Sequence, residues 1–216
     1  MLSITKKTSK YVFLFLLLFF CRLSALYAQT SEKWELSKSE EGIEIYVRRM
    51  ETSGFRQVLA KMKTDAFPTT CLALIQDAEA ATSWIDRMVK FELIDAENDS
   101  VWYTYGEIGI PWPFQNKDLI SKNSVTSDSL GSHICVALES VPDYLPEEEG
   151  KARIKDSEGK WEFYEKEGKT EIAYTMYAEA NDFLPNWLVE KIVVGSVFKT
   201  MENMKALLSE KNLSGK

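Results

Sequence analysis

The 216-residue sequence has few of the residues from which enzymes build active sites. It holds one histidine, His133, and three cysteines, of which Cys71 and Cys135 lie outside the N-terminal segment. One histidine and two separated cysteines argue against a zinc site. The glycine-rich nucleotide-binding motifs and the Gly-x-Ser-x-Gly elbow of hydrolases are also absent. We therefore expect no catalytic residues, no metal and no cofactor.

His133 and Cys135 form the one combination that resembles a nucleophilic pair. Strand alternation would place both side chains on the same face. A reactive cysteine also needs an activating environment, and no third group that would orient the histidine accompanies this pair. We interpret His133 as structural. We interpret Cys71 and Cys135 as separate buried thiols, because one falls in an expected helix and the other in an expected strand.

The chain begins with the parts of a secretory signal peptide. Three lysines among the first ten residues precede the unbroken apolar run 11–21. That run is too short to cross a bilayer core of ~30 Å as a helix. Ala28 is a small residue well placed for cleavage. We expect residues 1–28 to be removed and the rest to be periplasmic or secreted. An uncleaved membrane anchor is the alternative.

Removal of residues 1–28 makes the chain more acidic. That segment holds four basic residues and no acidic one, so the net charge changes from −7 to −11. Nucleic acids and anionic membrane surfaces attract clustered lysine and arginine, which this chain lacks. Residues 29–216 suit one domain with a sizeable core. We expect a monomer that binds no nucleic acid.

Short runs with a period of two predict antiparallel strands along most of the chain. Glycine-containing turns separate several of the runs, at Ser129-Leu130-Gly131, Glu158-Gly159 and Glu167-Gly168. The expected strands cover residues 34–38, 43–48, 55–62, 91–95, 101–105, 117–126, 132–140, 151–156, 160–166 and 170–179.

Two segments have helical spacing instead. Pro68 suits a first helical position, and the apolar residues that follow predict a helical region over 68–84. Helix-favouring residues with periodic apolar positions predict a longer helix over 186–209. The prolines in segment 109–114 predict an ordered loop with apolar side chains. This order of elements predicts an α+β fold with a long antiparallel sheet.

Several short motifs occur in a defined order. They are Trp84 after the first helix, Pro-Trp-Pro at 111–113 followed by Asn-Lys-Asp at 116–118, Glu-Ser-Val-Pro at 139–142, Arg-Ile at 153–154, and Leu-Pro-Asn-Trp-Leu-Val at 184–189. The ordered set, over about residues 32–210, resembles the START (StAR-related lipid transfer) domain family. Lys117 departs from that family's arginine, keeping the charge but losing bidentate geometry. Segment 179–183 lacks the family's Asp-x-x-Gly.

The resemblance implies a helix-grip fold, in which a curved antiparallel sheet wraps around a long C-terminal helix and leaves a hydrophobic tunnel. It also implies reversible binding of one lipid-like molecule without a cofactor. By family position, the expected pocket or gate residues are Trp84, Tyr103, Trp112, Trp161, Phe163, Tyr174, Met176, Trp187, Val193 and Val197.

The leading hypothesis is an exported carrier or sensor of one hydrophobic molecule, with transient membrane contact. Entry would require the loop 110–114 and the last helix to separate. One alternative is an enzyme of the aromatase/cyclase type, for which His133 with Tyr103 or Tyr105 would be the first polar group to examine.

A second alternative is a protein-interaction module. In that hypothesis the aromatic loop docks a partner through Trp112 and Phe114. Composition alone does not tell whether the aromatic and apolar residues form an ordinary core or line a lipid pocket, because both use the same residue types.

Overall fold

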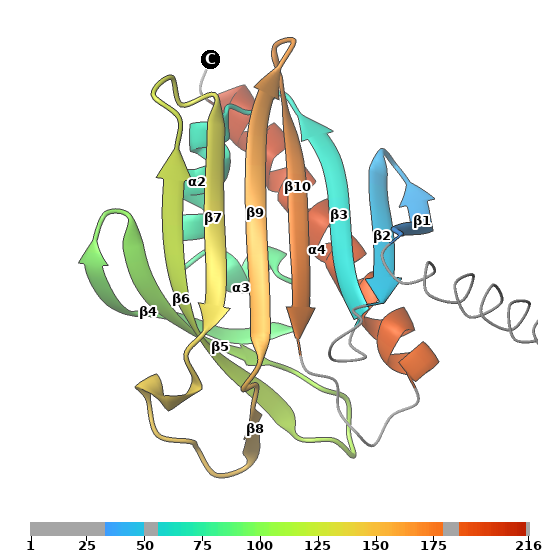
Figure 1. Cartoon of the computed structure of the whole chain (residues 1–216), viewed down its shortest axis with the longest axis vertical. Coiled ribbons are helices and arrows are strands. Elements are labelled where there is room, and N and C mark those ends of the chain that lie inside the picture. The colour runs from blue at the N-terminus through green and yellow to red at the C-terminus, as the bar shows by residue number, and fades with distance from the viewer. Residues whose placement is uncertain (1–32, 50–55, 179–185, 215–216) are drawn as a thin grey trace, which may run out of the picture.

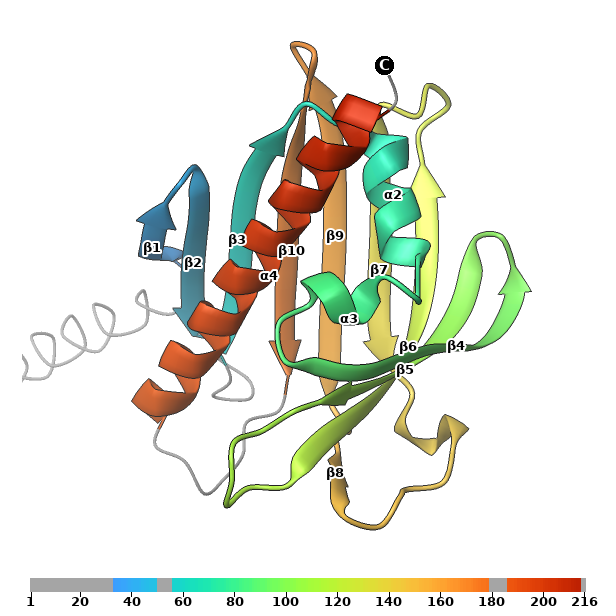
Figure 2. The ribbon, with the colours of Figure 1, turned by 180° about the vertical axis from the view of Figure 1, so that it is seen from behind.

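The computed structural model describes residues 33–49, 56–178 and 186–214, with side chains of the last segment described from 189 to 210. A curved sheet forms most of it, and helices lie on one of its faces (Figures 1 and 2). The strands are β1 (Glu35–Glu40), β2 (Ile43–Arg49), β3 (Arg56–Thr64), β4 (Met88–Asn98), β5 (Val101–Ile108), β6 (Asn116–Ser127), β7 (His133–Ser140), β8 (Lys151–Arg153), β9 (Ser157–Lys166) and β10 (Lys169–Ala178). The helices are α2 (Pro68–Gln76), α3 (Ala81–Trp84), α4 (Asn186–Ser214) and the 3-10 turn η1 (Pro142–Tyr144).

The ten strands form one sheet in the order β1-β2-β3-β10-β9-β7-β6-β5-β4, and β8 pairs with β6. All neighbours are antiparallel except β8, which runs parallel to β6. Strands β1 and β4 are the edges. The predicted α+β fold, with its antiparallel sheet and long terminal helix, is confirmed.

Alternating side chains define the face of the sheet that the helices cover. In β2, Ile43 and Ile45 are fully buried while the residues between them are partly exposed. Helix α4 lies across β2 and β3, and α2 lies over β7 and β9 (Figure 2). Apolar residues of these strands and helices pack into one core. We call this side of the sheet the helix face.

The predicted helical region 68–84 is two helices rather than one. Helix α2 ends at Gln76, and α3 begins at Ala81. Between them the Asp77 carboxylate accepts a hydrogen bond from the Ala80 backbone N–H at 3.0 Å. An Asp that binds the backbone three residues ahead competes with helix continuation, so the chain turns here.

The predicted strand boundaries near residue 157 were wrong. Glu158 and Gly159 were expected to form a turn between strands, but both lie inside β9, and β8 ends early at Arg153. A Cβ built on Gly159 would touch Leu138 and Tyr174 at 3.5–3.7 Å. Those are ordinary van der Waals distances, so the neighbours do not require a glycine here, and Gly159 continues the strand opposite Leu138 and Met176.

The other face of the sheet is also covered, over β5 and β6, by residues 141–154. Beneath this segment Tyr105 and Ile120 are 2% and 0% exposed, and Ile154 at its end is 5% exposed. The Asp118 carboxylate and the Arg153 guanidinium form a bidentate pair there, with two N–O distances of 2.9 Å. Strand β5 is thus buried on both faces, unlike β2.

The expected signal peptide, residues 1–28, lies outside the described residues. Within the described part of the chain, no helix has the length and apolar character needed to cross a membrane.

Candidate ligand-binding site

Aromatic side chains from three elements meet on the helix face. Trp161 of β9 stacks on Tyr174 of β10, with ring centroids 3.9 Å apart. Trp84 of α3 packs edge-on to Trp161 at 6.1 Å, and Phe163 lies 6.3 Å from it. Register explains part of this arrangement, because Trp161 is directly opposite Tyr174. We call Trp84, Trp161, Phe163 and Tyr174 the aromatic group.

Helix α4 holds Trp84 in place through polar side chains. The Asn203 amide donates to the Trp84 carbonyl at 3.1 Å, and the Thr200 hydroxyl accepts from the Asp86 backbone N–H at 3.0 Å. These bonds join two segments more than 110 positions apart. They fix the position of α3 between α4 and the sheet.

Helix α4 packs on the sheet along its described length. In its C-terminal half, Met201, Met204 and Leu208 have no exposed surface, and Val194 and Val197 are buried nearer its N-terminal end. Val193 is only partly buried, as is Met176 of the facing sheet. These two residues therefore keep accessible apolar surface towards the start of α4.

Tyr174 is enclosed by protein and yet retains some accessible surface. Burial alone raises the pKa of its hydroxyl to about 12, yet the side chain keeps accessible surface. A side chain surrounded by protein but still accessible has the surroundings expected of a binding-site lining. Tyr174, Met176 and Val193 are therefore candidates for contact with a bound molecule, among several partly buried apolar residues of this core.

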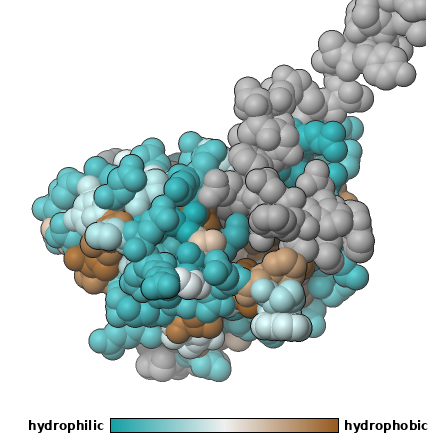
Figure 3. Space-filling view, turned by 90° about the horizontal axis from the view of Figure 1, so that it is seen from below, coloured by the Kyte–Doolittle hydropathy of each residue, from teal (hydrophilic) through white to brown (hydrophobic). Residues whose placement is uncertain are grey.

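The loop between β5 and β6 carries exposed aromatic residues. Trp112 is 92% exposed and Phe114 is 36% exposed. The Trp112–Pro113 peptide bond is cis. The loop lies at the same end of the sheet as the start of α4 (Figure 2). Seen from this end, apolar residues are exposed between hydrophilic ones (Figure 3).

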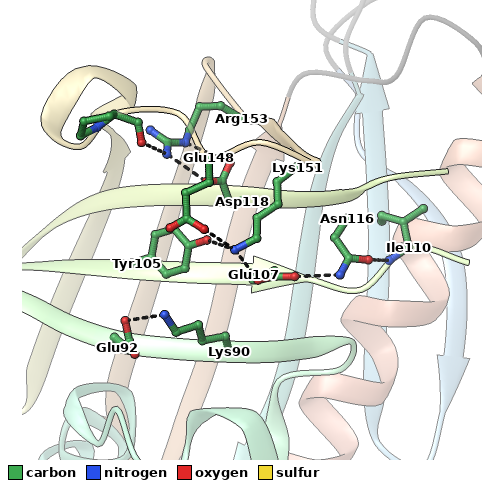
Figure 4. Close-up of polar contacts among 11 residues, drawn as sticks. Lys90, Glu92, Tyr105, Glu107, Ile110, Asn116, Asp118, Glu148, Lys151 and Arg153 are labelled. Atoms are coloured by element: carbon green, nitrogen blue, oxygen red, sulfur yellow. Dashed lines mark hydrogen bonds and ion pairs between the residues drawn. The ribbon is translucent and has the colours of Figure 1, made fainter.

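A polar network joins both ends of this loop to the strands behind it (Figure 4). Asn116 accepts from the Ile110 backbone N–H at 3.1 Å and donates to Glu107 at 2.7 Å. Lys151 binds the other Glu107 oxygen at 2.9 Å, and also Glu148 and Tyr105. Hydrogen bonds from Lys151 and Asn116 hold the pKa of the Glu107 carboxyl below its usual value. We call Glu107, Ile110, Asn116 and Lys151 the loop anchor.

Arg153 holds segment 141–154 against the other face of the sheet. Besides its two bonds to Asp118, it donates to the carbonyls of Pro142, Leu145 and Pro146 at 2.6–3.1 Å. All five guanidinium N–H groups therefore have acceptors. The bidentate partner of Asp118 is Arg153, so Lys117 does not take that role.

The structure brings most of the predicted site residues together and separates others. Trp84, Trp161, Phe163, Tyr174, Met176, Val193 and Val197 share the helix-face core. Tyr103 lies on the opposite face, stacked on Tyr144 at 4.5 Å. Trp112 projects into solvent. The Trp187 side chain lies outside the described residues.

His133 and Cys135 do not form a nucleophilic site. His133 stacks on Tyr164 with ring centroids 4.0 Å apart. Burial, and secondarily the charge of Glu162, raises the pKa of the Cys135 thiol, which disfavours the thiolate. Burial raises the pKa of Cys71 to about 12, and both cysteines are free. Cys71 is buried as expected, whereas Cys135 was expected to be buried and is only partly buried.

His133 also forms no site with Tyr103 and Tyr105 of β5, because both tyrosines have other partners. Tyr103 donates to Glu97, and Tyr105 accepts from Lys151. No group of three histidine, cysteine or acidic side chains that could hold a metal occurs among the residues that the structure describes.

Sequence reasoning missed the loop anchor. Three of its members are ordinary polar residues and Ile110 contributes only its backbone N–H, while Lys151 follows Glu107 by more than forty positions. The one signal was Asn116 directly after the proline-rich loop, where an Asx side chain often binds the loop backbone.

Comparisons with known proteins agree with this geometry. No family model matches the chain. An uncharacterised protein of Pseudomonas aeruginosa is 27% identical over 177 residues, covering 82% of this chain and 87% of that protein. The phosphatidylcholine transfer protein of Mus musculus is 24% identical over 183 residues, covering 82% and 84%.

Solved structures extend the comparison. An aromatase/cyclase from a Streptomyces species has a TM-score of 0.53 at 12% identity, covering 73% of this chain and 95% of its own, which shows the fold alone. The STAR-related lipid transfer protein of Xanthomonas axonopodis superposes with a TM-score of 0.75 at 31% identity, covering 82% of this chain and 98% of its own. With that identity over nearly the whole of the solved chain, this protein belongs to the START (StAR-related lipid transfer) domain family.

Proposed function

We propose that the protein is a carrier that holds one hydrophobic molecule between α4 and the helix face. The observation that supports this most directly is the accessible apolar surface of Tyr174, Met176 and Val193 beside the aromatic group. Burial of apolar ligand surface is favourable by roughly 25 cal/mol per Å². An apolar lining therefore retains such a molecule without charge pairing.

The ligand enters, in this proposal, at the end of the sheet where the loop 109–115 and the start of α4 lie. Val193 and Met176 keep accessible surface towards that end, whereas the fully buried Met201, Met204 and Leu208 lie further along α4. The loop must leave its anchor for the opening to widen. The exposed Trp112 then contacts the donor or acceptor membrane, because tryptophan favours the membrane–water interface.

The carrier acts outside the cytoplasm in this proposal. Support comes from the sequence of residues 1–28, with its lysines, apolar run and small residue at Ala28. Sequencing the N-terminus of the protein purified from its native host tests this step. A mature chain that starts after Ala28 agrees with export, and a retained segment would make the protein a tethered sensor instead.

The binding function can be tested on the purified protein. We expect organic-solvent extracts to contain a hydrophobic molecule by mass spectrometry, and fluorescent lipids to bind at one site. Val193→Phe should lower the bound amount because the larger side chain fills the lining. The same enlargement at Val89, which is 57% exposed in β4, is the control. The carrier function is wrong if nothing co-purifies and no lipid probe binds.

A protein-interaction module is the second candidate, favoured by the 92% exposure of Trp112. If this candidate is correct, replacing Trp112 and Phe114 with alanine should abolish capture of a partner protein and leave lipid uptake unchanged. The enzyme alternative gains nothing from the described geometry, because His133 is not near the tyrosines proposed to accompany it.

A further inference from the structure

The indole N–H of Trp84 is a buried donor without an acceptor. Trp84 is 2% exposed. Among the side chains that the structure describes, only Trp84 Nε1 and His133 Nε2 are buried polar atoms with no hydrogen-bond partner. A buried donor left unpaired costs free energy, so such groups usually have a partner or a function.

This donor is held rigidly on the helix face. The Trp84 ring packs edge-on to Trp161, and its carbonyl is bound by Asn203 of α4. Trp161 in turn stacks on Tyr174, whose hydroxyl makes no hydrogen bond with the described residues. Two uncommitted polar groups therefore flank Trp161 in the region where apolar surface remains accessible.

The buried lining around these groups carries no charge. Of the buried side chains that the structure describes, only Asp118 and Arg153 are charged, and they pair on the opposite face. The buried polar residues of β5 and β6 on the helix face are Thr104, Ser121 and Asn123, all neutral. A charged ligand group placed there would lose its hydration without gaining a counter-ion.

We propose that Trp84 Nε1 donates a hydrogen bond to a neutral oxygen of the bound molecule, so that the ligand is an uncharged lipid with a hydroxyl, ester or ketone group. This inference rests on the proposed carrier function. If the ligand instead had an anionic head group, Lys117 would be the residue to bind it. Lys117 is partly buried at the start of β6, and strand alternation places it on the helix face with Leu119 and Ser121.

Three fluorescent probes with one chain length test the inference: pyrenyl-dodecanol, pyrenyl-dodecanoic acid and dodecylpyrene. At neutral pH we expect the alcohol to bind more tightly than the carboxylate. Trp84→Phe should weaken alcohol binding about three- to tenfold, the effect of one lost hydrogen bond, and change dodecylpyrene binding little. Trp102→Phe, the same change in β5 of the same core, is the control.

A measurement on the unsubstituted protein covers the case in which Trp84→Phe does not fold. Proton–nitrogen correlation NMR should show the Trp84 indole signal moving downfield with the alcohol and not with dodecylpyrene. The inference is overturned if the carboxylate binds most tightly and loses affinity in Lys117→Gln. Equal losses for alcohol and hydrocarbon in Trp84→Phe, or an unmoved indole signal, also overturn it. If none of the three probes binds, the carrier function itself fails.

Discussion

At the scale of single residues, Arg153 illustrates how a buried charge becomes structural. Its side chain and that of Asp118 are each 1% exposed, and every guanidinium donor has an acceptor. Removing one partner of such a pair leaves the other charge buried and unpaired, which is far more costly than losing a surface ion pair.

We expect Arg153→Ala to lower the free energy of unfolding by about 3–5 kcal/mol, because Asp118 loses its counter-ion and three carbonyls lose a donor. Urea denaturation measures this change. Lys63→Ala, which removes the exposed ion pair with Glu171, should have little effect. Similar losses in both variants would show that the Asp118–Arg153 pair is not a major source of stability.

Glu107 makes the loop anchor sensitive to pH. Its folded pKa is below its ordinary value of about 4.3. A lowered carboxyl pKa adds stability that is fully present above the unfolded value and is lost as the pH falls through the folded value. The ion pair with Lys151 is therefore intact at neutral pH and weakens below roughly pH 4.

We expect the protection factor of the Ile110 amide against hydrogen exchange to fall as the pH drops below that range. Its acceptor, Asn116, is held by Glu107. The Gly109 amide, which donates to the Arg87 carbonyl at 2.8 Å, is the internal reference. In Glu107→Gln the dependence on pH should disappear. An Ile110 amide that follows Gly109 at every pH would contradict the role of Glu107.

At the scale of elements, the docking of α3 on α4 decides where Trp84 lies. We expect Asn203→Ala to lower stability by about 1 kcal/mol and to weaken ligand binding, since the Trp84 carbonyl loses its donor. Calorimetry and a fluorescent-lipid titration measure the two effects. Ser209→Ala, which removes a hydrogen bond internal to α4, is the matched control. Unchanged binding in Asn203→Ala would mean that α3 is held by packing alone.

Strand alternation predicted most of the sheet, because one face packs against helices and the other is more exposed. The helical region 68–84 was predicted as a whole but not its break at Asp77, which depends on a side-chain bond to the backbone. The turn at Glu158 and Gly159 was wrong because a glycine was read as a turn signal. Gly159 instead lies inside β9, paired with Leu138 of β7 and Met176 of β10.

The predicted site shows the same limit. Alternation placed Trp161 with Phe163, and Tyr174 with Met176, on common faces, and these residues do meet in the core. It also implied that Trp102 and Tyr103 lie on opposite faces, but not which one faces α4. Both faces of β5 are buried, so hydrophobicity could not decide. The structure places Trp102 in the helix-face core and Tyr103 against Tyr144.

At the scale of the whole molecule, the proposed carrier function assigns binding and exchange to different parts. The aromatic group and α4 would set affinity, whereas Trp112 lies outside the core and is 92% exposed. We expect Trp112→Ala to slow transfer of a fluorescent lipid between vesicles several-fold while its equilibrium affinity stays the same. Leu130→Ala, at a residue that is 88% exposed in another loop, is the control. Equal transfer rates in the two variants would remove the loop from the exchange step.

In the proposed carrier, the burial of α4 has a mechanical consequence. Met201, Met204 and Leu208 are fully buried, so the C-terminal half would be the pivot of any tilt, while Val193 towards the other end is only partly buried. At a rise of 1.5 Å per residue, Val193 lies about 16 Å along the helix from Met204. A tilt of about 10° at the pivot would move Val193 by roughly 3 Å. Admission of a ligand would then need a small rotation of an intact helix and no unfolding, with the displacement greatest at the end where the loop 109–115 lies.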